Sequence, residues 1–465
     1  MRRPNIPTAL TFAAMMAAPA FAGDTPSPVP VTRPEIKRVL EGSKHSRPRL
    51  PLPPLTEAEK ARLERAQSGV ERGVFAGIVN NARMRNYYLA PELRNEFTVR
   101  PSDLASRDPK AAVRAGASDP SMPLDPTFRV MFFWLVARMN NCYYCLGHQE
   151  VKLKAAGVGD DRLAALDTDW SAFNPAERAA FTFVVKLGRR PDEIVAADLD
   201  ALRKHFNDRE ILDILVSTGG FAAMTRWTGG LMIPQEDHRV YLTPTSEPFV
   251  DRPSLVAPLD PSRPGASLTC APATTHRPAL ESRKEVEARL AACRSREPRL
   301  PLVDEDRARA VVPAAFSSGP LPQWIRLLAQ FPEAGKARIL SLLAAQDKGA
   351  LDRTLRAQIA WAAAREDRAW YAIGHARRRL RELGQSDDAI FALDDPKDPS
   401  ATPARTAVLS LARKLTVNPA LVTDADVQAV RDHFSDRETA EVVYFITTAA
   451  FFDRVTEAAG LRLEF

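Results

Sequence analysis

The sequence predicts an all-α protein made of two tandem copies of one helical unit, and three observations support this. Apolar residues recur at steps of three and four positions, as in Phe132, Leu135, Val136 and Met139, and the strict alternation of a strand is absent. Helix-start signals recur at matched places in the two halves. The chain also contains a long internal repeat.

Four helix starts are marked by residues that cap a first turn. A polar residue followed by proline is typical of an N-cap and the first helical position, and a polar residue with glutamate three positions later is typical of a capping box. The four pairs are Asn174 with Pro175, Thr402 with Pro403, Asn207 with Glu210, and Ser435 with Glu438. Each type occurs once in each half, so we expect the same helices in both.

The repeat is visible without gaps over long stretches. The segment LDPTFRVMFFWLVARMNNCYYCLGHQ, residues 124–149, aligns with LDRTLRAQIAWAAAREDRAWYAIGHA, residues 351–376, which lies 227 positions later. LRKHFNDREILDILV matches VRDHFSDRETAEVVY 228 positions later, and PRLPL occurs at Pro48 and again at Pro298. The chain is therefore an internal duplication.

Proline-rich stretches suggest where the two copies begin and end. Many of the 38 prolines collect in segments such as RPRLPLPPL and DRPSLVAPLDPSRPGASLTCAPATTHRP, which are typical of linkers. We expect a signal peptide at 1–22, a flexible segment at 23–45, a first domain at 46–249, a Pro-rich linker at 250–296 and a second domain at 297–465.

The first residues have the layout of an export signal. Two arginines precede an apolar run from Thr8 to Pro19, and the small-residue motif Ala20-Phe21-Ala22 follows. We expect cleavage after Ala22 and a periplasmic or secreted protein. No later apolar segment reaches the roughly 20 residues that a spanning helix needs, so no membrane span is expected after cleavage.

The amino-acid composition limits the kinds of partner that the protein is expected to bind. Apolar residues make up 45% of the chain, which is enough for substantial cores, and the formal net charge is +6. That charge is mild and scattered, whereas nucleic-acid binding needs clustered basic residues. We therefore expect no nucleic-acid partner.

The candidate catalytic residues lie in the stretch NNCYYCLGHQE, residues 140–150. On a helix, Cys142, Cys145 and His148 fan over roughly 120° with Cys145 in the middle. Cys145 would then have a partner thiol one turn before it and an imidazole one turn after it. This is the layout of an attacking cysteine, a resolving cysteine and a base, and a helix start lowers a thiolate pKa.

Other uses of this motif fit less well. A c-type haem site needs histidine directly after the second cysteine, where Leu146 stands. Structural zinc needs four ligands, and no second Cys-x-x-Cys or paired histidines supply the rest. An inert disulfide is the remaining alternative, although a two-residue gap closes too small a loop to stabilise much. We therefore expect neither a metal nor a cofactor.

The second copy provides an internal contrast. Cys142 and Cys145 align with Ala369 and Ala372, whereas the histidine is retained as His375. Sulfur is therefore dispensable for the architecture, and His375 is expected to be a packed or hydrogen-bonded core residue.

Two further pairs of residues stand out. Cys270 and Cys293 lie in or beside the linker, 23 positions apart, and could form a disulfide in an exported protein. Arg226 has its counterpart in Arg454; either residue could bind an anion or tie helices together, and we favour the tie.

ARMNNCYYCLGHQE, together with NPAERAAFTFVVKL, HFNDREILDILV and MTRWTGGLMIP, resembles the carboxymuconolactone decarboxylase and alkylhydroperoxidase D-like superfamily. The resemblance covers roughly residues 47–237 and, in degraded form, 298–465. It implies two tandem alkylhydroperoxidase D-like helical domains and a fold that oligomerises, so a homo-oligomer is possible. It also implies that Cys145 is the reactive thiolate, that Cys142 resolves it, and that His148 belongs to a proton relay.

The resemblance implies an antioxidant, peroxidase-type oxidoreductase. Its substrate would be a peroxide or another small oxidant, and an unknown thiol donor would restore the dithiol. The relay glutamate of the peroxidases would fall near Val130, but no Asp or Glu occurs from 126 to 141. The relay is shortened, is completed from elsewhere by Glu210, Glu236 or His205, or is missing. A non-catalytic helical scaffold or binding protein, or a cofactor-free decarboxylase-like enzyme, remains an alternative.

Overall fold

The computed structural model describes residues 29–70, 76–94, 119, 121–238, 247–258, 279–313 and 319–465. Regular secondary structure in these ranges is helical throughout, without a strand, so the all-α prediction is confirmed. In the first half the α-helices are α1 (Arg33–Gly42), α2 (Glu57–Gln67), α3 (Asn80–Tyr88), α6 (Pro126–Met139), α7 (Tyr143–Ala155), α8 (Asp160–Thr168), α9 (Pro175–Arg189), α10 (Ala196–Arg203) and α11 (Asp208–Gly230).

The second half follows a similar order, with one further helix among the described residues. Its α-helices are α12 (Arg283–Arg294), α13 (Glu305–Arg309), α14 (Gln323–Leu328), α15 (Ala334–Asp347), α16 (Arg353–Asp367), α17 (Trp370–Glu382), α18 (Asp387–Ala392), α19 (Pro403–Val417), α20 (Asp424–Arg431) and α21 (Asp436–Ala458). Short 3₁₀ helices lie at Ser43–His45, Pro91–Leu93, Trp170–Ala172, Pro191–Glu193, Glu247–Phe249 and Pro419–Leu421. The predicted helix pair 124–149 and its repeat 351–376 become α6 with α7 and α16 with α17.

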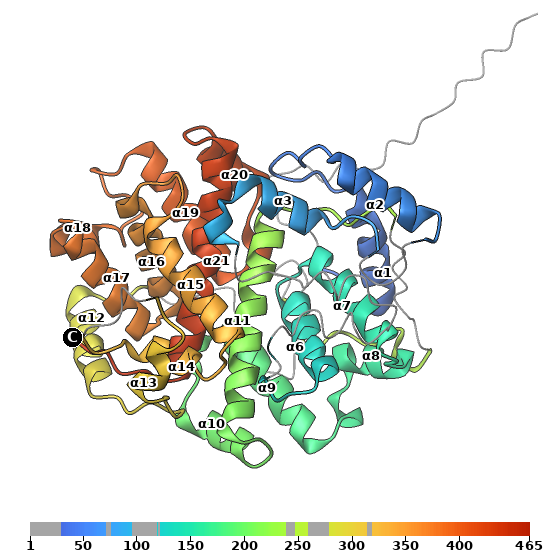
Figure 1. Ribbon diagram of the computed structural model, residues 1–465, viewed down its shortest axis with the longest axis horizontal. Helices are drawn as coiled ribbons and strands as arrows, with labels where there is room; N and C mark the ends of the chain where they lie inside the picture. The colour runs from blue at the N-terminus through green and yellow to red at the C-terminus, as the bar shows by residue number, and fades with distance from the viewer. Residues whose placement is uncertain are drawn as a thin grey trace, which may run out of the picture.

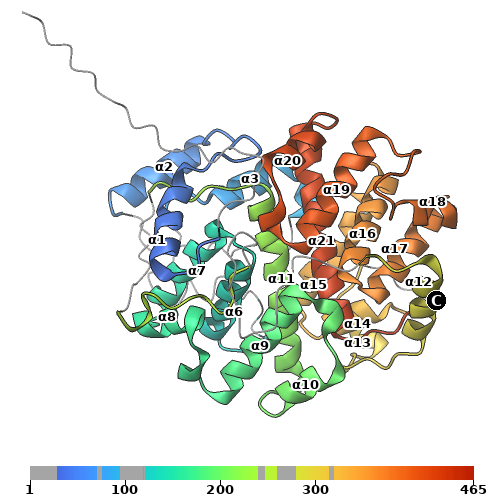
Figure 2. The same cartoon turned by 180° about the vertical axis from the view of Figure 1, so that it is seen from behind.

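The long helices α11 and α21 lie side by side at the centre of the molecule, with most of the first half beside α11 and most of the second half beside α21, while α3 of the first half also contacts α21 (Figure 1). The view from behind shows the same central pair (Figure 2). Contact between them is close, since a Cβ added at Gly219 would lie 2.9 Å from Val455. The two copies therefore share one hydrophobic core instead of forming two separate globules.

All four predicted helix starts are present. The side chains of Asn174 and Asn207 accept the N–H groups of Glu177 at 2.9 Å and Glu210 at 3.0 Å. In the second half, Thr402 caps α19 and Ser435 caps α21 in the same way. Each cap satisfies backbone donors that a helix leaves unpaired at its first turn.

Arg226 and Arg454 cross between the copies. Arg226, on α11, donates from Nη2 to the Thr416 carbonyl oxygen at 2.6 Å. Arg454, on α21, donates to the Gly188 carbonyl oxygen at 3.3 Å and forms a fully buried ion pair with Asp367 at 2.6 Å. The prediction that these arginines tie helices together is confirmed.

The predicted boundaries need two corrections. Residues 33–42 lie in the segment expected to be flexible, yet they form α1, because Ile36 and Leu40 give this helix a buried apolar face and Arg33 forms a buried ion pair with Glu150 at 2.9 Å. Likewise, residues 283–294 of the expected linker form α12, which packs against α17. Each copy of the repeat therefore begins with a helix before its PRLPL segment, α1 in the first copy and α12 in the second. The expected signal peptide and Cys270 lie outside the described residues.

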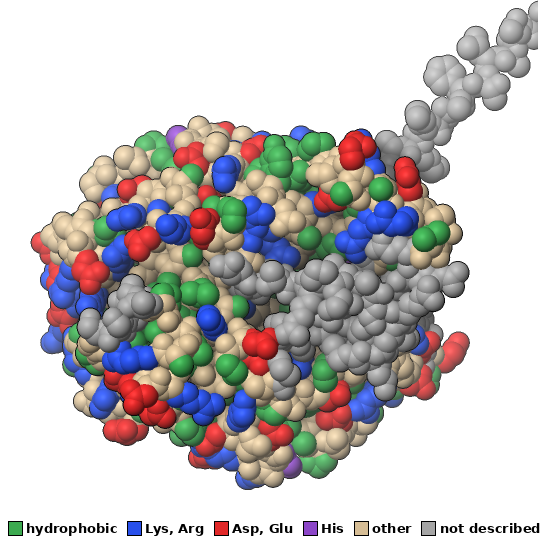
Figure 3. Space-filling view, viewed as in Figure 1, with side chains coloured by type: hydrophobic (Ala, Val, Ile, Leu, Met, Phe, Trp, Pro, Cys, Tyr) green, Lys and Arg blue, Asp and Glu red, His purple; other side chains and the backbone are tan. Residues whose placement is uncertain are grey.

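Within the described ranges, none of the helices is both long and apolar enough to cross a membrane. On the face seen in Figure 3, Lys and Arg side chains alternate with Asp and Glu side chains over both halves.

Candidate thiol site

A turn between α6 and α7 positions the two cysteines. Asn141 adopts the left-handed backbone with φ 52°, a region that asparagine enters more readily than most residues. The Cys142 N–H then donates to the Ala137 carbonyl oxygen at 2.9 Å. Cys142 becomes the N-cap of α7, with Cys145 in the first turn. The expectation that both cysteines lie inside one helix is therefore corrected: Cys142 stands at the helix start.

One hydroxyl group lies against both sulfurs. Thr228, near the end of α11, places its Oγ1 3.0 Å from Cys142 Sγ and 3.0 Å from Cys145 Sγ, so the sulfurs lie within twice that distance of each other. Both cysteines are 3% exposed. Thr228 Oγ1 also lies 3.0 Å from the Met224 carbonyl oxygen. Because a hydroxyl group has one proton, Thr228 can donate to only one of these three acceptors at a time.

The two thiols differ in acidity. Burial raises the pKa of Cys142, but hydrogen bonds from Cys145, from Thr228 and from the Cys145 N–H outweigh burial and leave this pKa below its ordinary value. Burial and the neighbouring Cys142 raise the pKa of Cys145 well above its ordinary value. One of these hydrogen bonds comes from the backbone: the Cys145 N–H donates to Cys142 Sγ at 3.4 Å. The dithiol therefore loses its first proton on the Cys142 side.

His148 sits between a carbonyl oxygen and a carboxylate. Its Nδ1 lies 2.8 Å from the Tyr144 carbonyl oxygen, which can only accept, so Nδ1 carries the proton. Its Nε2 lies 3.1 Å from Oε2 of Glu236, whose side chain is fully buried. The imidazole packs on the Tyr144 ring with the centroids 4.4 Å apart. Of the three acids or bases proposed to back the relay, Glu236 is the one that meets His148.

Further donors hold Glu236 in place. Its Oε1 accepts the Tyr144 hydroxyl at 2.8 Å and the Asn80 backbone N–H at 2.8 Å. Two donors on one oxygen fix the orientation of the carboxylate and leave Oε2 toward His148. Next to it in sequence, Gln235 donates from Nε2 to the Tyr143 carbonyl oxygen at 2.7 Å and so fixes the first turn of α7 from outside.

The other two residues proposed to complete the relay, Glu210 and His205, lie in other parts of the structure. Glu210 completes the capping box of α11, where its Oε2 accepts the Asn207 N–H at 2.8 Å. His205 is exposed at the end of α10. Neither residue belongs to the environment of the cysteines.

The second copy has the same polar arrangement without sulfur. Tyr371 donates to Glu464 Oε1 at 2.7 Å, and His375 Nε2 lies 3.4 Å from Glu464 Oε2. The Gln323 backbone N–H also donates to Glu464, at 2.6 Å. Ala369 takes the N-cap position of Cys142. His375 was expected to be a packed or hydrogen-bonded core residue; it packs on the Tyr371 ring and faces Glu464, but its side chain is 24% exposed and does not belong to the core.

Sequence reasoning singled out Cys142, Cys145 and His148, and all three residues are buried. The two sulfurs meet at Thr228, whereas the ring nitrogens of His148 face the Tyr144 carbonyl oxygen and Glu236. It missed Thr228, Tyr144 and Gln235. A signal for Glu236 was available: Glu464 lies 228 positions after it, the same separation as in the second block of the repeat. Thr228 and Thr456 also share this separation, but a threonine pair by itself indicates no chemistry.

Cys293 is separate from this site. It lies in α12, buried, with Sγ 3.6 Å from the Leu461 carbonyl oxygen, and burial raises its pKa to about 11. The predicted pairing with Cys270 involves a residue outside the described ranges and stays a prediction. Across the described part of the chain, no three His, Cys, Asp or Glu side chains are grouped to hold a metal ion.

No protein-family model matches the sequence, and a comparison with curated protein sequences finds no significant match.

Proposed function

We propose that this chain is an exported, thiol-dependent oxidoreductase of the alkylhydroperoxidase D-like type, acting on a peroxide through Cys142 and Cys145. The observation that carries the proposal is the Thr228 hydroxyl, 3.0 Å from both sulfurs, in a buried region that also holds the His148–Glu236 pair. Two thiols on one hydroxyl share a proton easily, and one thiolate is the species that reacts.

The proposed reaction has two steps on the protein. Cys145 thiolate attacks the outer oxygen of ROOH, the O–O bond breaks, and RO⁻ leaves as Cys145 becomes a sulfenic acid. The Cys142 thiol then condenses with the sulfenic acid to give a disulfide and water. A dithiol donor returns two electrons and two protons, so one peroxide yields one alcohol and one water.

The first step needs a proton shift inside the pair. The resting thiolate is favoured on Cys142, whose pKa is lowered by its hydrogen bonds, so Cys145 attacks after passing its proton to Cys142. Thr228 bridges the two sulfurs and can turn its own proton toward whichever is charged. In this scheme Thr228 is a positioning residue for the shared proton.

His148 and Glu236 would manage the proton of the leaving group. The Tyr144 carbonyl fixes Nδ1 as a donor and leaves Nε2 facing Glu236, so the pair can hold a proton between them. The leaving RO⁻ needs one proton, and we assign its supply to His148. The second copy, which lacks both sulfurs, would act as a built-in partner for the first through the α11–α21 contact.

Thiol titration of the purified mature protein tests the proposal. With one equivalent of hydrogen peroxide, the wild type should lose the thiols of Cys142 and Cys145 together. Cys142→Ser should stop at a sulfenic acid that a dimedone-type reagent traps on Cys145, whereas Cys145→Ser should show no fast loss. Cys293, which is buried in α12 apart from the dithiol, serves as an internal control and should keep its thiol.

Other results would favour the alternatives. If the thiols of the folded protein do not react with peroxide, the non-catalytic scaffold becomes the better hypothesis. Decarboxylation of a lactone acid that survives Cys142→Ser and Cys145→Ser but fails in His148→Asn would favour the decarboxylase-like enzyme.

A further inference from the structure

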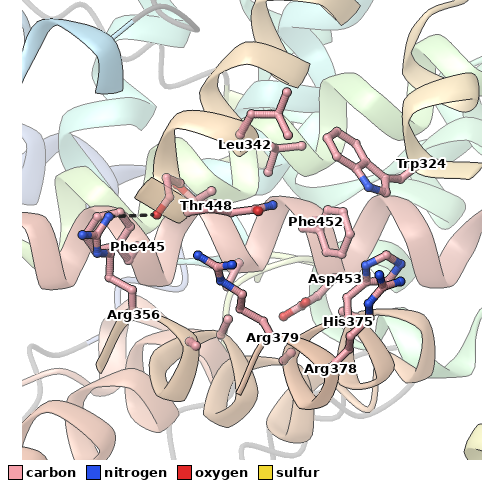
Figure 4. A pocket seen from close by; sticks show the side chains of 18 of the residues that line it. Trp324, Leu342, Arg356, His375, Arg378, Arg379, Phe445, Thr448, Phe452 and Asp453 are labelled. Atoms are coloured by element: carbon pink, nitrogen blue, oxygen red, sulfur yellow. Dashed lines mark hydrogen bonds between the residues drawn. The ribbon is translucent and has the colours of Figure 1, made fainter. Parts of the chain in front are cut away.

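The second copy contains a cavity of about 330 Å³ between α15, α16, α17 and α21 (Figure 4). Its size is within the range of small-molecule sites. Aromatic and aliphatic side chains form much of its wall, among them Trp324, Leu342, Phe445 and Phe452. The cavity reaches His375 and Ala372, the position where the first copy has Cys145.

Side-chain size along the repeat differs in both directions here. Phe445, Thr448 and Phe452 are larger than Ser217, Gly220 and Met224 of the first copy, whereas several other lining residues are smaller. Five alanines line the cavity at positions where the first copy has larger residues. The pairs are Ala357 for Val130, Ala360 for Phe133, Ala372 for Cys145, Ala376 for Gln149, and Ala449 for Phe221.

The largest of these differences is a lost aromatic pair. In the first copy Phe133 and Phe221 stack with their centroids 4.5 Å apart and fill the space between α6 and α11. Ala360 and Ala449 stand at the equivalent places. The alanines widen the cavity while Phe445 and Phe452 give it aromatic walls, so the space is suited to an apolar or aromatic occupant.

Arginines gather on the exposed side of the cavity. The side chains of Arg353, Arg378 and Arg379 are 58%, 56% and 30% exposed. Arg379 pairs with Asp347 at 3.1 Å, and Arg378 pairs with Glu382 at 3.0 Å.

A fourth arginine, Arg356, lines the wall and donates to the Leu351 carbonyl oxygen. The four arginines outnumber the two carboxylates that pair with them. Their exposed ion pairs are weak and can be exchanged for a ligand carboxylate.

A buried acid lines the inner wall. Asp453 is 1% exposed, and among the described residues its Oδ2 has no hydrogen-bond partner. Burial, with the negative charge of Asp367, raises the pKa of Asp453 well above its ordinary value, so its neutral form can donate a hydrogen bond into the cavity. A buried polar atom without a partner is uncommon in native proteins, which marks this wall of the cavity as unusual.

We infer that this cavity binds a small organic acid: a carboxylate held by Arg378 and Arg379 at the exposed side, with a compact apolar or aromatic body among Trp324, Phe445 and Phe452. Arginine forks match a carboxylate in a bidentate manner, which favours it over a neutral polar group. Because Ala369 and Ala372 replace the cysteines, this site needs no thiol chemistry, and the inference is independent of the proposed peroxidase reaction.

Calorimetric titration of the full mature protein with 4-phenylbutyrate and with its neutral amide tests the inference. The carboxylate should bind with Kd below 1 mM and at least 10-fold more tightly than the amide. Arg378→Gln with Arg379→Gln should weaken the carboxylate about 10-fold and leave the amide unchanged. Arg437→Gln, an exposed arginine on α21 outside the cavity, is the matched charge control.

A second variant fills the cavity. Ala360→Phe with Ala449→Phe restores the aromatic pair of the first copy and should abolish binding of both probes. If this variant loses its helical circular dichroism, Ala376→Gln, which restores one polar residue of the first copy, replaces it with the same expectation.

Cys142→Ser with Cys145→Ser should bind the carboxylate as the wild type does. Failure of the wild type to bind the carboxylate at 1 mM, equal binding of carboxylate and amide, or unchanged binding by a folded filled variant would overturn the inference.

Discussion

Glu236 and Glu464, 228 positions apart, make the same contacts in the two copies. Each accepts a tyrosine hydroxyl, from Tyr144 at 2.8 Å or Tyr371 at 2.7 Å, and each faces a histidine of α7 or α17. Their surroundings differ: the side chain of Glu236 is fully buried, whereas that of Glu464 is 27% exposed and the histidine that it faces, His375, lines a cavity. The same polar arrangement is therefore present in two different surroundings.

Glu236→Gln should slow the reaction of the dithiol with peroxide about 100-fold, because it removes the charge that holds the proton on His148. Stopped-flow loss of thiols at pH 7 measures this. Glu464→Gln is the matched control and should leave the rate unchanged. Equal slowing by both variants would point to a loss of shared structure instead of a role in the relay.

Thr228→Val keeps the shape of the side chain and removes the hydroxyl that lies against both sulfurs. A hydrogen bond to a charged group contributes about 1.5–3 kcal/mol, so the thiolate should become less stable and react roughly 10- to 100-fold more slowly at pH 7. Thr456→Val loses only the contact to the Phe452 carbonyl oxygen and should react normally. A Thr228→Val rate within twofold of the wild type would contradict the bridging role.

The pH dependence of alkylation should separate the two thiols. Only thiolates react, so a lowered pKa moves the rise in rate to lower pH and a raised pKa moves it to higher pH. Cys142 should therefore titrate below the ordinary range of a thiol, and Cys145 well above it. Iodoacetamide labelling from pH 5 to 10, read by peptide mass spectrometry, measures both. In Cys142→Ser the pKa of Cys145 should fall, since the neighbouring charge is gone.

Arg454→Met should lower the free energy of unfolding by about 3–5 kcal/mol, because it leaves Asp367 buried without its cation. Adding Asp367→Asn should recover part of that loss, and denaturant unfolding of the three variants measures the coupling. Arg203→Met, at an exposed ion pair, should cost less than about 1 kcal/mol. An Arg454→Met cost as small as that of Arg203→Met would contradict the proposed role of the buried pair.

Much of the fold follows from local sequence. The caps at Asn174, Asn207, Thr402 and Ser435 fix where helices begin, because they satisfy first-turn donors within a few residues. The break before α7 was not predicted. It depends on the left-handed backbone at Asn141, which recurs at Arg368, a residue type without preference for that conformation. Tertiary packing overrides local preference there.

The candidate site was predictable in its sulfurs and histidine, whose spacing is local, but not in its supporting residues. Thr228 and Glu236 come from the far end of α11 and the segment after it, more than 80 positions from Cys142. Their approach is decided by how α11 packs on α6 and α7.

By itself the sequence determined the helical class, the duplication, the helix starts and the asymmetry between a copy with sulfur and a copy without it. These depend on residue identity and short spacing. Three features were decided only by the tertiary structure. Helices α11 and α21 pack together and join the two copies in one core, and Glu236 faces His148. A cavity lined partly by alanines lies beside His375. Each of these depends on side chains distant in sequence that share one packed volume, which no local pattern encodes.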